Sequence, residues 1–230
     1  MAFFKRAKVR SYEIGLLFRD GEFHELITEG TRWIFDPLGK VEVEIVSQRD
    51  PHLLHEKLDL IVKSGELENR AVVLDLKDHE RALVWIDNRF AEILPTGLYA
   101  FWTGERDIRV EIVDARTVRF NHPELNLIVR TPAAYHVLET VQVNRDAVGV
   151  LFIDGRYIDL LPPGQYAFWR GRSDVKVVEI DQRETMVDVS GQDIMTADKV
   201  TLRLNAVVTY RIADARRAVS GTEDVQQSLY

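Results

Sequence analysis

One stretch of sequence occurs three times in this chain, and successive copies are 67 residues apart both times. The copies are DGEFHELITEGTRWIFDP at 20–37, DNRFAEILPTGLYAFWTG at 87–104 and DGRYIDLLPPGQYAFWRG at 154–171. Over a window of 31 residues, 15 positions are identical between the second and third copies, and 9 between the first and second. Unrelated chains would agree at about one or two of these positions, so the sequence indicates an internal duplication.

Each copy carries two turn signals at fixed places. The first is a residue pair that accepts left-handed backbone angles, as the tightest β-hairpins require: Asp20-Gly21, Asp87-Asn88 and Asp154-Gly155. The second is a glycine after the first apolar run: Gly30, Gly97 and Gly164. Alternating apolar residues follow, as a half-buried strand requires: Val41, Val43 and Ile45; Ile108, Val110 and Ile112; Val175 and Val177. Every copy is therefore expected to open as a small antiparallel meander.

Aromatic residues recur beside both turns. Around the first turn they form the pairs Phe18 and Phe23, Trp85 and Phe90, Phe152 and Tyr157. After the second turn they are Phe35, Trp102 and Trp169. Aromatic residues at fixed places beside turns are typical of core packing, and the acidic charge of the chain disfavours a surface that stacks nucleic-acid bases. We therefore expect all of them in the core.

Two segments that link the copies have a helical pattern. In the first, residues 52–65, an apolar face would contain Leu54, Leu58, Ile61 and Val62, and the helix would end at Gly65. The second, residues 122–132, is shorter and lies between Pro123 and Pro132. The pattern predicts an α+β fold of three tandem small antiparallel β-rich units with short helices. The expected boundaries are 1–66, 67–133 and 134–230.

The third copy continues into a tail that the other two lack. A long strand is expected over 199–212, with one face formed by Val200, Leu202, Leu204, Ala206, Val208, Tyr210 and Ile212. A strand of that length is expected to have neighbours on both sides. Residues 214–219 suggest one or two helical turns, and Ser220 to Glu223 has the form of a capping box that opens another helix. Because that helix would be too short to be stable alone, we expect it to continue past Tyr230.

The C-terminal third resembles a known family. The stretch from Val148 to Ser228 is similar to the start of the stomatin, prohibitin and flotillin superfamily, also called SPFH or Band 7, and looks most like its slipin branch. The resemblance is carried by VGVLFIDGRYIDLLPPGQYAFW, then VDVSGQDIMTADKVTLRLNAVVTYRIADARRAV, then TEDVQQSLY. Within these lie Thr196, Asp198 and Val200, followed by Tyr210, Arg211 and Asp214. The last unit is thus expected to form a truncated SPFH-type domain.

The resemblance implies a function without chemistry. Members of the family are homo-oligomers that organise or border membranes and often regulate membrane-bound proteases or channels. Tandem β-units that lead into one such domain also resemble the arrangement of the major vault protein. The membrane hairpin that precedes the domain in stomatins is missing here, and the long helical region behind it is cut off. Membrane residence therefore does not transfer from the family.

Composition excludes several classes of protein. The net charge of -7 and the pI near 5.4 argue against nucleic acid as a partner, because phosphate backbones require clustered Lys and Arg. The chain has no cysteine, which excludes disulfides, thiolate nucleophiles and Cys-ligated metals. No apolar run is long enough to span a bilayer, so a cytoplasmic location is expected. Peripheral contact of the basic terminus MAFFKRAKVR with a membrane, through Phe3 and Phe4 beside four cations, is an open alternative to a frayed end.

Candidate sites for chemistry are few. His52 and His55 beside Glu56 could approach one metal, but a third ligand is lacking, so a surface histidine pair is preferred. His79-Glu80 lacks the second histidine of a metalloprotease motif. Residues that recur in all three copies suggest turn bonding or ion pairing within each unit: Glu25, Glu92 and Asp159, and Arg49, Arg116 and Arg183. We expect no catalytic residue, metal site or cofactor.

Two functions remain as hypotheses. The first is a self-assembling scaffold that forms a large homo-oligomeric ring or cage, because small units that do not bury a full core alone stack on neighbours. A protease or channel partner follows only from the resemblance. The alternative is a monomeric or small-oligomer module that binds a protein or peptide through loops 36–40, 103–107 and 170–174, which differ in charge.

Overall fold

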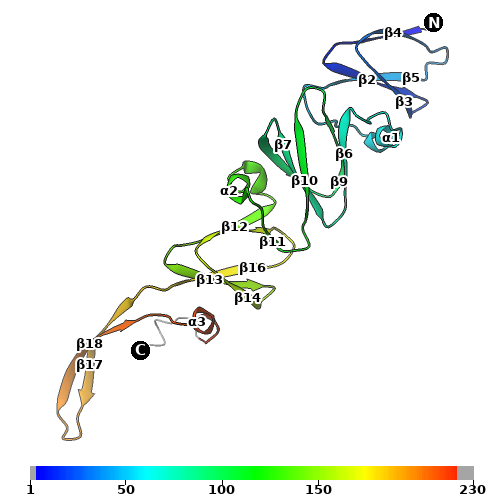
Figure 1. The fold of residues 1–230 in the computed structure, drawn as a ribbon. Coiled ribbons are helices and arrows are strands. Elements are labelled where there is room, and N and C mark those ends of the chain that lie inside the picture. The colour runs from blue at the N-terminus through cyan, green and yellow to red at the C-terminus, as the bar shows by residue number, and fades with distance from the viewer. Residues whose placement is uncertain (1–3, 222–230) are drawn as a thin grey trace. The chain divides into compact units, whose positions relative to one another are not determined.

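The computed structural model describes residues 4–221. The chain divides into two compact units, Met1–Thr117 and Val118–Tyr230. Both consist mostly of antiparallel strands with a few short helices (Figure 1), which confirms that the fold is β-rich.

The first five strands form set 1, and the same pairing recurs later in the chain. Its strands are β1 (Phe4–Val9), β2 (Glu13–Arg19), β3 (Glu22–Ile27), β4 (Gly30–Phe35) and β5 (Val41–Ser47). β1 pairs with β4 as a two-stranded ribbon, while β2 lies between β3 and β5 in a three-stranded sheet. All of these pairings are antiparallel, as the alternating pattern predicts.

Set 2 follows a linker that contains α1 (Leu58–Lys63). Its strands are β6 (Ala71–Leu76), β7 (Glu80–Ile86), β8 (Arg89–Leu94), β9 (Gly97–Trp102) and β10 (Ile108–Asp114). β6 pairs with β9, and β7 lies between β10 and β8. Each strand begins 67 residues after its counterpart in set 1, as the start of β6 at 71 and of β1 at 4 shows (71 − 4 = 67).

The second unit holds set 3 and the tail. Set 3 consists of β12 (Leu138–Val143), β13 (Ala147–Ile153), β14 (Arg156–Leu161), β15 (Gly164–Trp169) and β16 (Val175–Asp181). It is preceded by β11 (Arg119–Phe120), α2 (Leu125–Ile128) and the 3-10 turn η1 (Pro132–Ala134). The tail is β17 (Thr185–Met195), β18 (Thr201–Tyr210) and α3 (Ala215–Gly221). β15 lies between β11 and β12, and β13 lies between β14 and β16.

The first turn of every set has the backbone that its sequence predicts. The leading residues Asp20, Asp87 and Asp154 have φ of 53°, 51° and 51°. The following Gly21, Asn88 and Gly155 also have positive φ, so both central residues are left-handed. A register shift precedes the turn at the same place in each first hairpin, between Leu17 and Phe18, Val84 and Trp85, and Leu151 and Phe152. The aromatic pairs beside these turns pack edge to face, with ring centroids 5.6, 5.3 and 6.3 Å apart.

The core of each set lies between the pair formed by its first and fourth strands and the three-stranded sheet formed by its second, third and fifth strands. In set 1 it contains Ala7, Val9, Leu17, Ile27, Ile34 and Val41. In set 2 the equivalent core contains Leu74, Leu76, Ala82, Val84, Leu94 and Phe101. In set 3 it contains Val143, Ala147, Leu151, Leu161, Tyr166 and Phe168. Each core is small, so the outer faces of the sheets matter for stability.

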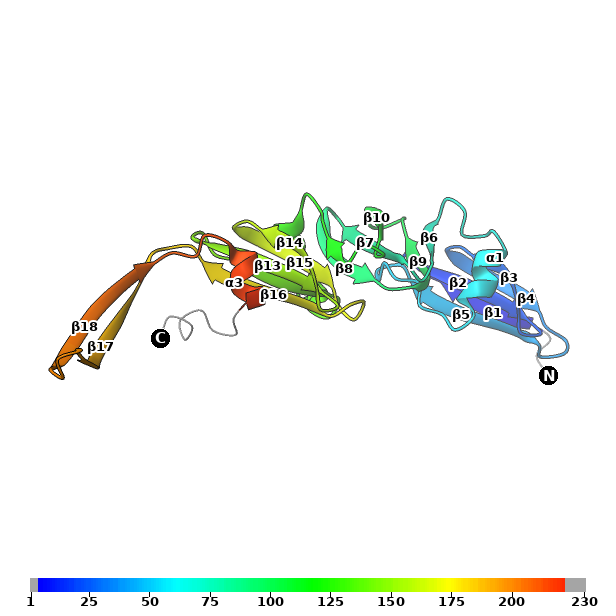
Figure 2. The same ribbon diagram turned by 90° about the horizontal axis from the view of Figure 1, so that it is seen from below.

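A second cluster in the first unit joins set 1 to set 2. Alternate residues of β2, including Leu16 and Phe18, point away from the core of set 1 and pack with Ile61 of α1 and with Trp102 of β9. The linker also pairs with the edge of β9, because the Trp102 amide donates to the Pro51 carbonyl at 2.8 Å. Figure 2 shows α1 against the sheet that contains β2 and β3. The linker thus covers surfaces that neither set buries alone.

The linker helices are shorter than their patterns predict. α1 begins at Leu58, and Leu54, expected on its apolar face, is 75% exposed. The helix does end where expected, since Gly65 has φ of 79° directly after the C-cap residue Ser64. The preceding residues are held in extended pairing with β9, which prevents an earlier helix start.

Phe35 corrects the prediction that every recurring aromatic lies in the core. Its counterparts Trp102 and Trp169 are 0% and 3% exposed, whereas Phe35 is 58% exposed. The reason is structural: linker residues pair with β9, and β11 pairs with β15, but in residues 4–221 no strand pairs with the corresponding edge of β4.

The tail differs from expectation in two places. β18 pairs with β17 alone among the described strands, so the second neighbour that its length suggests is not found there. The short helix expected at 214–219 is confirmed as α3, but it includes Ser220 and Gly221, which were expected to open a further helix. The rest of that capping box, from Thr222, lies outside the described residues, as does Phe3.

Candidate assembly site: the C-terminal hairpin

The hairpin of β17 and β18 contains the residues that carry the family resemblance. Nine residue pairs run antiparallel from Thr185 opposite Tyr210 to Met195 opposite Thr201. The register shifts between Val189 and Gln192, where Gly191 has φ of 72°. The Gly191 amide donates to Asn205 Oδ1 at 3.0 Å, so an asparagine of the facing strand satisfies the amide that the bulge frees.

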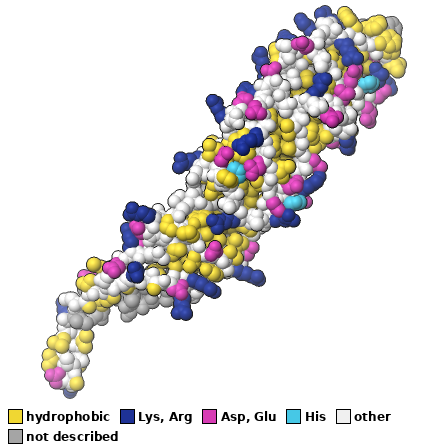
Figure 3. Space-filling view, in the orientation of Figure 1, with side chains coloured by type: hydrophobic (Ala, Val, Ile, Leu, Met, Phe, Trp, Pro, Cys, Tyr) yellow, Lys and Arg dark blue, Asp and Glu magenta, His cyan; other side chains and the backbone are white. Residues whose placement is uncertain are grey.

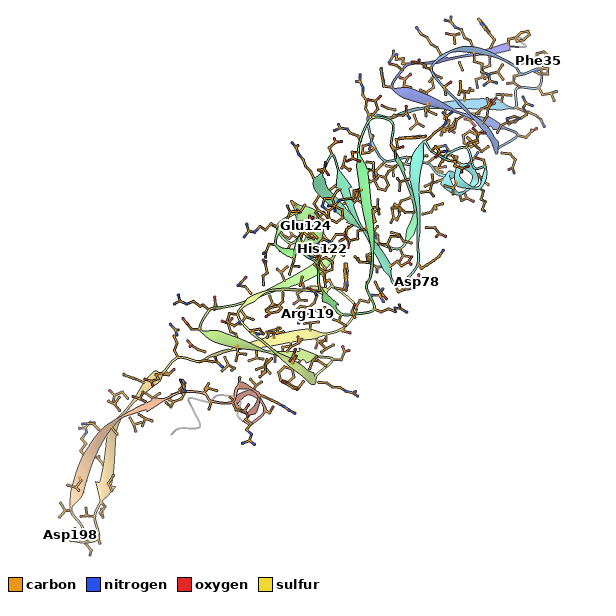
Figure 4. All side chains as sticks on the ribbon, viewed as in Figure 1. Phe35, Asp78, Arg119, His122, Glu124 and Asp198 are labelled. Carbon is orange, nitrogen blue, oxygen red and sulfur yellow. The ribbon has the colours of Figure 1, made fainter. Side chains whose placement is uncertain are left out.

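The turn of the hairpin is closed by Thr196. Its amide donates to the Val200 carbonyl at 2.9 Å, and its Oγ1 accepts from the Val200 amide at 3.1 Å. The Thr196 hydroxyl also bonds the Asp198 carboxylate, and this bond, with the backbone amide of Asp198, lowers the pKa of Asp198. Lys199 has φ of 66°, a left-handed angle within the turn. The threonine and aspartate of the family motif are therefore turn-forming residues, and Figure 4 shows Asp198 at the tip of the hairpin.

One face of the hairpin is apolar. Residues directly opposite one another share a face, so the pairs Val187 with Val208 and Ile194 with Leu202 lie on the same side. Ile194 and Leu202 are 47% and 53% exposed. The sequence prediction of an apolar face on the long strand is confirmed for these positions. A two-stranded ribbon is marginally stable by itself, so an apolar face on it is a surface for contact.

Charge is divided between the two strands. The charged residues of β17, Asp188 and Asp193, are both acidic, whereas the charged residue of β18 is Arg203. Each strand also has one edge without a partner strand among the described residues, where its backbone donors and acceptors remain available for pairing. Asp193 and Arg203 lie directly opposite each other in the register, so the two charges share the face opposite the apolar one.

α3 fixes the end of the hairpin strand to set 3. The Asp214 carboxylate accepts from the Arg217 amide at 3.0 Å, which caps the first turn of the helix. Ala215 is buried, and the Arg216 guanidinium lies 4.4 Å from the centre of the Tyr157 ring of β14. The helix thus leaves β18 and returns to the surface of set 3, as Figure 2 shows.

The histidines that could have formed a metal site point to different carboxylates. His52 Nε2 lies 2.7 Å from Glu92 Oε1, whereas His55 Nε2 lies 3.0 Å from Glu44 Oε2. His55 Nδ1 also accepts from the Lys57 amide at 2.9 Å, so this ring closes the turn before α1. No cluster of metal ligands occurs in the part of the chain that the structure describes.

The same turn chemistry recurs before α2. His122 Nδ1 accepts from the Glu124 amide at 3.0 Å, and Figure 4 shows both residues at the start of this segment. His122 stands 67 positions after His55 (122 − 55 = 67), so the two histidines are equivalent. A recurring histidine that bonds the amide two residues ahead could have been recognised from the sequence as a turn residue.

The other recurring residues also bond locally. Arg116 pairs with Asp114, and Arg183 with Asp181, at 2.5 and 2.6 Å. Each arginine side chain, together with its own amide, holds the pKa of that aspartate at about 2, below the ordinary 3.8. Arg49 instead lies 4.0 Å from the centre of the Tyr12 ring.

The recurring acids have a different partner in each set. Glu25 pairs with Arg32 at 3.0 Å, and Glu92 bonds His52 of the linker. Asp159 Oδ1 accepts from the Leu160 amide at 2.8 Å. His79 and Glu80 also serve a turn, because the Ala115 amide donates to the His79 carbonyl and the Lys77 amide donates to Glu80. Of these contacts, the pair of Asp181 and Arg183 lines an open surface hollow that also includes Asp146 and Glu179.

Comparison with known proteins supports the superfamily. Residues 141–230 match the model of the SPFH domain / Band 7 family. An uncharacterized protein of Archaeoglobus fulgidus is 36% identical over 78 residues, which are 34% of this chain and 30% of that protein. An uncharacterized protein of Methanocaldococcus jannaschii is 33% identical over 89 residues, 39% of this chain and 44% of that protein. The chain therefore covers less than half of either relative, and no solved structure matches it significantly.

A search for membrane-spanning helices gives a negative result. Among residues 4–221, no helix is both long enough and apolar enough to cross a bilayer.

Proposed function

We propose that this protein is a non-enzymatic, self-assembling scaffold of the stomatin type that forms a large homo-oligomeric ring or cage beside a membrane. The match to the SPFH domain supports a scaffold family in general. The observation that carries the proposal is the hairpin of β17 and β18, which has an apolar face, opposite charges on its two strands and, among residues 4–221, no partner strand at either outer edge.

The geometry of the hairpin favours a head-to-tail contact between copies. If β17 of one copy lies beside β18 of the next, the opposed Asp193 and Arg203 of successive copies alternate along one face, and each Asp193 also lies beside the neighbour's Arg203. Such a contact joins two different surfaces, so it generates a ring when the rotation closes. A contact between identical surfaces would instead stop at a dimer.

The strand sets serve as the wall of the assembly in this proposal. Their strands recur at 67 residues with the same pairing, which supports three tandem copies of one unit as predicted from the sequence. The likeness to slipins is part of this proposal and rests on the residues of the C-terminal third. The likeness to the major vault protein is also part of it and rests on the tandem order of the strand sets. We also propose a protease or a channel as a partner, and this part of the proposal rests on the family resemblance alone.

Native mass by light scattering tests the proposal. We expect one species of many subunits, which Arg203→Asp shifts toward smaller species because the new carboxylate then meets Asp193 of its own hairpin and of the neighbour. The double variant Asp193→Arg with Arg203→Asp reverses both charges of this opposed pair and should restore the assembly. Leu202→Ser should weaken it, whereas Leu54→Ser, at a side chain that is 75% exposed in the linker, should not.

A monomer or dimer across a wide range of concentration and salt would contradict the scaffold. The binding-module alternative would then be favoured, with the loops between β4 and β5, β9 and β10, and β15 and β16 as its contact surface. An assembly that persists unchanged in Arg203→Asp and Leu202→Ser would retain the scaffold but exclude the hairpin as its contact.

A further inference from the structure

The β1–β4 outer face consists of six side chains on one side of the ribbon of β1 and β4. The backbone register places them in three directly opposed pairs: Phe4 with Phe35, Arg6 with Trp33, and Lys8 with Thr31. The other side of the same ribbon carries Ala7, Val9 and Ile34, which are buried in the core of set 1. The six side chains therefore point away from the core.

Three large aromatic side chains on this face are exposed to solvent. The exposed fractions of Phe4, Trp33 and Phe35 are 57%, 62% and 58%. The rings of Phe4 and Phe35 lie 5.4 Å apart, and the Arg6 guanidinium lies 5.8 Å from the centre of the Trp33 ring. Figure 3 shows hydrophobic side chains gathered over β1 and β4 with Lys and Arg around them, and Figure 4 shows Phe35 projecting at the edge. An aromatic cluster of this kind on a folded surface indicates a contact site.

A turn beside the face adds another apolar group. Leu38 is exposed in the turn after β4. The Asp36 carboxylate accepts from the amides of Lys40 and Val41 at 2.8 and 3.3 Å. These bonds hold the turn closed and present Leu38 at its tip.

The cations on this face are not neutralised by acids. Among the residues that the structure describes, no ion pair involves Arg6 or Lys8, and the six positions of the face include no Asp or Glu. Nearby Arg32 and Lys40, in contrast, pair with Glu25 and Asp20. The charge of the face is therefore positive although the whole chain is acidic.

Equivalent faces in the other sets lack this combination. In set 2, Asp75 stands where set 1 has Lys8, and Val73 where it has Arg6. In set 3 these positions hold Gln142 and Thr140. The cations are thus specific to set 1.

We infer that the β1–β4 outer face binds the surface of an anionic lipid bilayer. Trp and Phe side chains are favoured at the boundary between headgroups and acyl chains, where their rings leave water. Arg6 and Lys8 on the same face would meet the lipid phosphates and acidic headgroups, to which each cation is attracted. The inference rests on the membrane-side location in the proposed function and names the surface that makes the contact, which belongs to a different unit from the hairpin of β17 and β18.

Lipid fits this face better than a second copy of the chain. The core of a protein interface is depleted in lysine, whereas this face carries Lys8 and Arg6 among its aromatic side chains. A bilayer accommodates exposed aromatics and cations in one layer.

Intrinsic fluorescence provides a direct test on the unmodified chain. Of the four tryptophans, Trp85, Trp102 and Trp169 are 1%, 0% and 3% exposed, so Trp33 is the one that reports the surface. With vesicles of phosphatidylcholine and phosphatidylserine, we expect a blue shift and quenching by brominated acyl chains. Vesicles of phosphatidylcholine alone should give a much smaller signal. Trp33→Phe should still sediment with the anionic vesicles while losing the spectral change.

Two double variants test the two components of the contact. Arg6→Gln with Lys8→Gln should reduce vesicle affinity about 25-fold, from two cations. The matched control Arg156→Gln with Lys176→Gln removes two exposed cations of set 3 and should change affinity less than about twofold. Trp33→Ala with Phe35→Ala should reduce affinity about tenfold or more, and the control Leu54→Ala with Leu127→Ala should not.

Circular dichroism and denaturant unfolding establish that each variant is folded before binding is measured. Absence of sedimentation with anionic vesicles at low salt overturns the inference, as does an equal loss in the test and control variants. A blue shift of Trp33 that depends on protein concentration without vesicles would assign the face to contact between copies. Native mass is measured separately on the same samples, so failure of the scaffold leaves the vesicle result to be judged by itself.

Discussion

The ribbons β1–β4 and β6–β9 have the same strand pairing, but the outer face of β4 is exposed where that of β9 is covered by other residues. Phe35 and Trp102 stand at equivalent positions, 67 residues apart (102 − 35 = 67), yet one is 58% exposed and the other fully buried. The linker that contains α1 packs on β9 and pairs with its edge, whereas no described segment pairs with the same edge of β4. Burial of an aromatic residue in a tandem fold is therefore decided by the neighbouring segment and not by the local sequence.

The largest expected effect is the difference in stability between two single alanine variants at the equivalent aromatic positions. Trp102→Ala should lower the free energy of unfolding by about 3–5 kcal/mol, because it empties a packed site between two sets. Phe35→Ala should change it by less than about 0.5 kcal/mol, because that ring is largely in water. Denaturant unfolding of both variants measures the difference.

A conservative variant sharpens the first prediction. Trp102 Nε1 is buried and has no hydrogen-bond partner among the described residues. Trp102→Phe therefore loses no hydrogen bond and should cost clearly less than Trp102→Ala. Equal costs for Phe35→Ala and Trp102→Ala would mean that the β1–β4 face is covered in solution.

The covering linker itself provides the second test, at two adjacent residues. Leu53 is 1% exposed and packs with Trp102, and its amide donates to the Ala100 carbonyl at 2.9 Å. Leu53→Ala should lower the free energy of unfolding by about 2–4 kcal/mol. Leu54→Ala, on the solvent side, should change it by less than about 0.5 kcal/mol. If the two variants unfold at the same denaturant concentration, the linker is not docked on β9.

A smaller effect is expected where the sets differ by one methyl group. Gly149 of β13 corresponds to Ala82 of β7, and a Cβ at Gly149 would lie 2.9 Å from both Val143 Cγ2 and Val177 Cγ1. Gly149→Ala should therefore cost about 1–3 kcal/mol through overpacking. Ala82→Gly should cost about 1 kcal/mol, since it loosens a strand and removes a buried methyl. A stabilised Gly149→Ala variant would show that the core of set 3 has room to expand.

The sequence predicted the strands well because their signals are local. The pairs Asp20-Gly21 and Asp87-Asn88 adopt the left-handed angles that their composition requires, and the alternating segments are strands. Exposure of Phe35 was not predictable from its own copy, because what covers that position is a segment distant in sequence. A comparison of the copies did indicate that the cations of β1 are specific to set 1, because Arg6 and Lys8 are replaced by Val73 and Asp75 in the second copy.

The hairpin was predicted in part. The apolar face of the long strand follows from alternation, but its partner was not identified from the sequence. The bulge at Gly191 depends on a hydrogen bond that the Gly191 amide donates to Asn205 Oδ1, fourteen residues away (205 − 191 = 14), which no periodicity indicates. The start of α1 was also missed, because pairing with β9 overrides the helical pattern of residues before Leu58.

The smallest expected effect is a pH dependence that distinguishes set 1 from the other two. Asp114 and Asp181 end β10 and β16, whereas the equivalent residue of β5 is Ser47. The arginine two residues later holds the pKa of each aspartate at about 2, below the ordinary 3.8. A lowered pKa in the folded state adds stability above pH 3.8, and this contribution is lost as the pH falls toward 2.

Carboxyl NMR titration measures these two groups directly. In the wild-type chain both should titrate near 2, and Arg116→Gln should return Asp114 toward 3.8 while Asp181 stays unchanged. Arg49→Gln should alter neither, because Arg49 stacks on Tyr12 and bonds Ser47 through its backbone amide. All of these groups are exposed, so salt should weaken the shift. If Asp114 keeps its low pKa in Arg116→Gln, the backbone amide of residue 116 and not the guanidinium stabilises the carboxylate. The side-chain pairing that distinguishes sets 2 and 3 from set 1 would then have no electrostatic role.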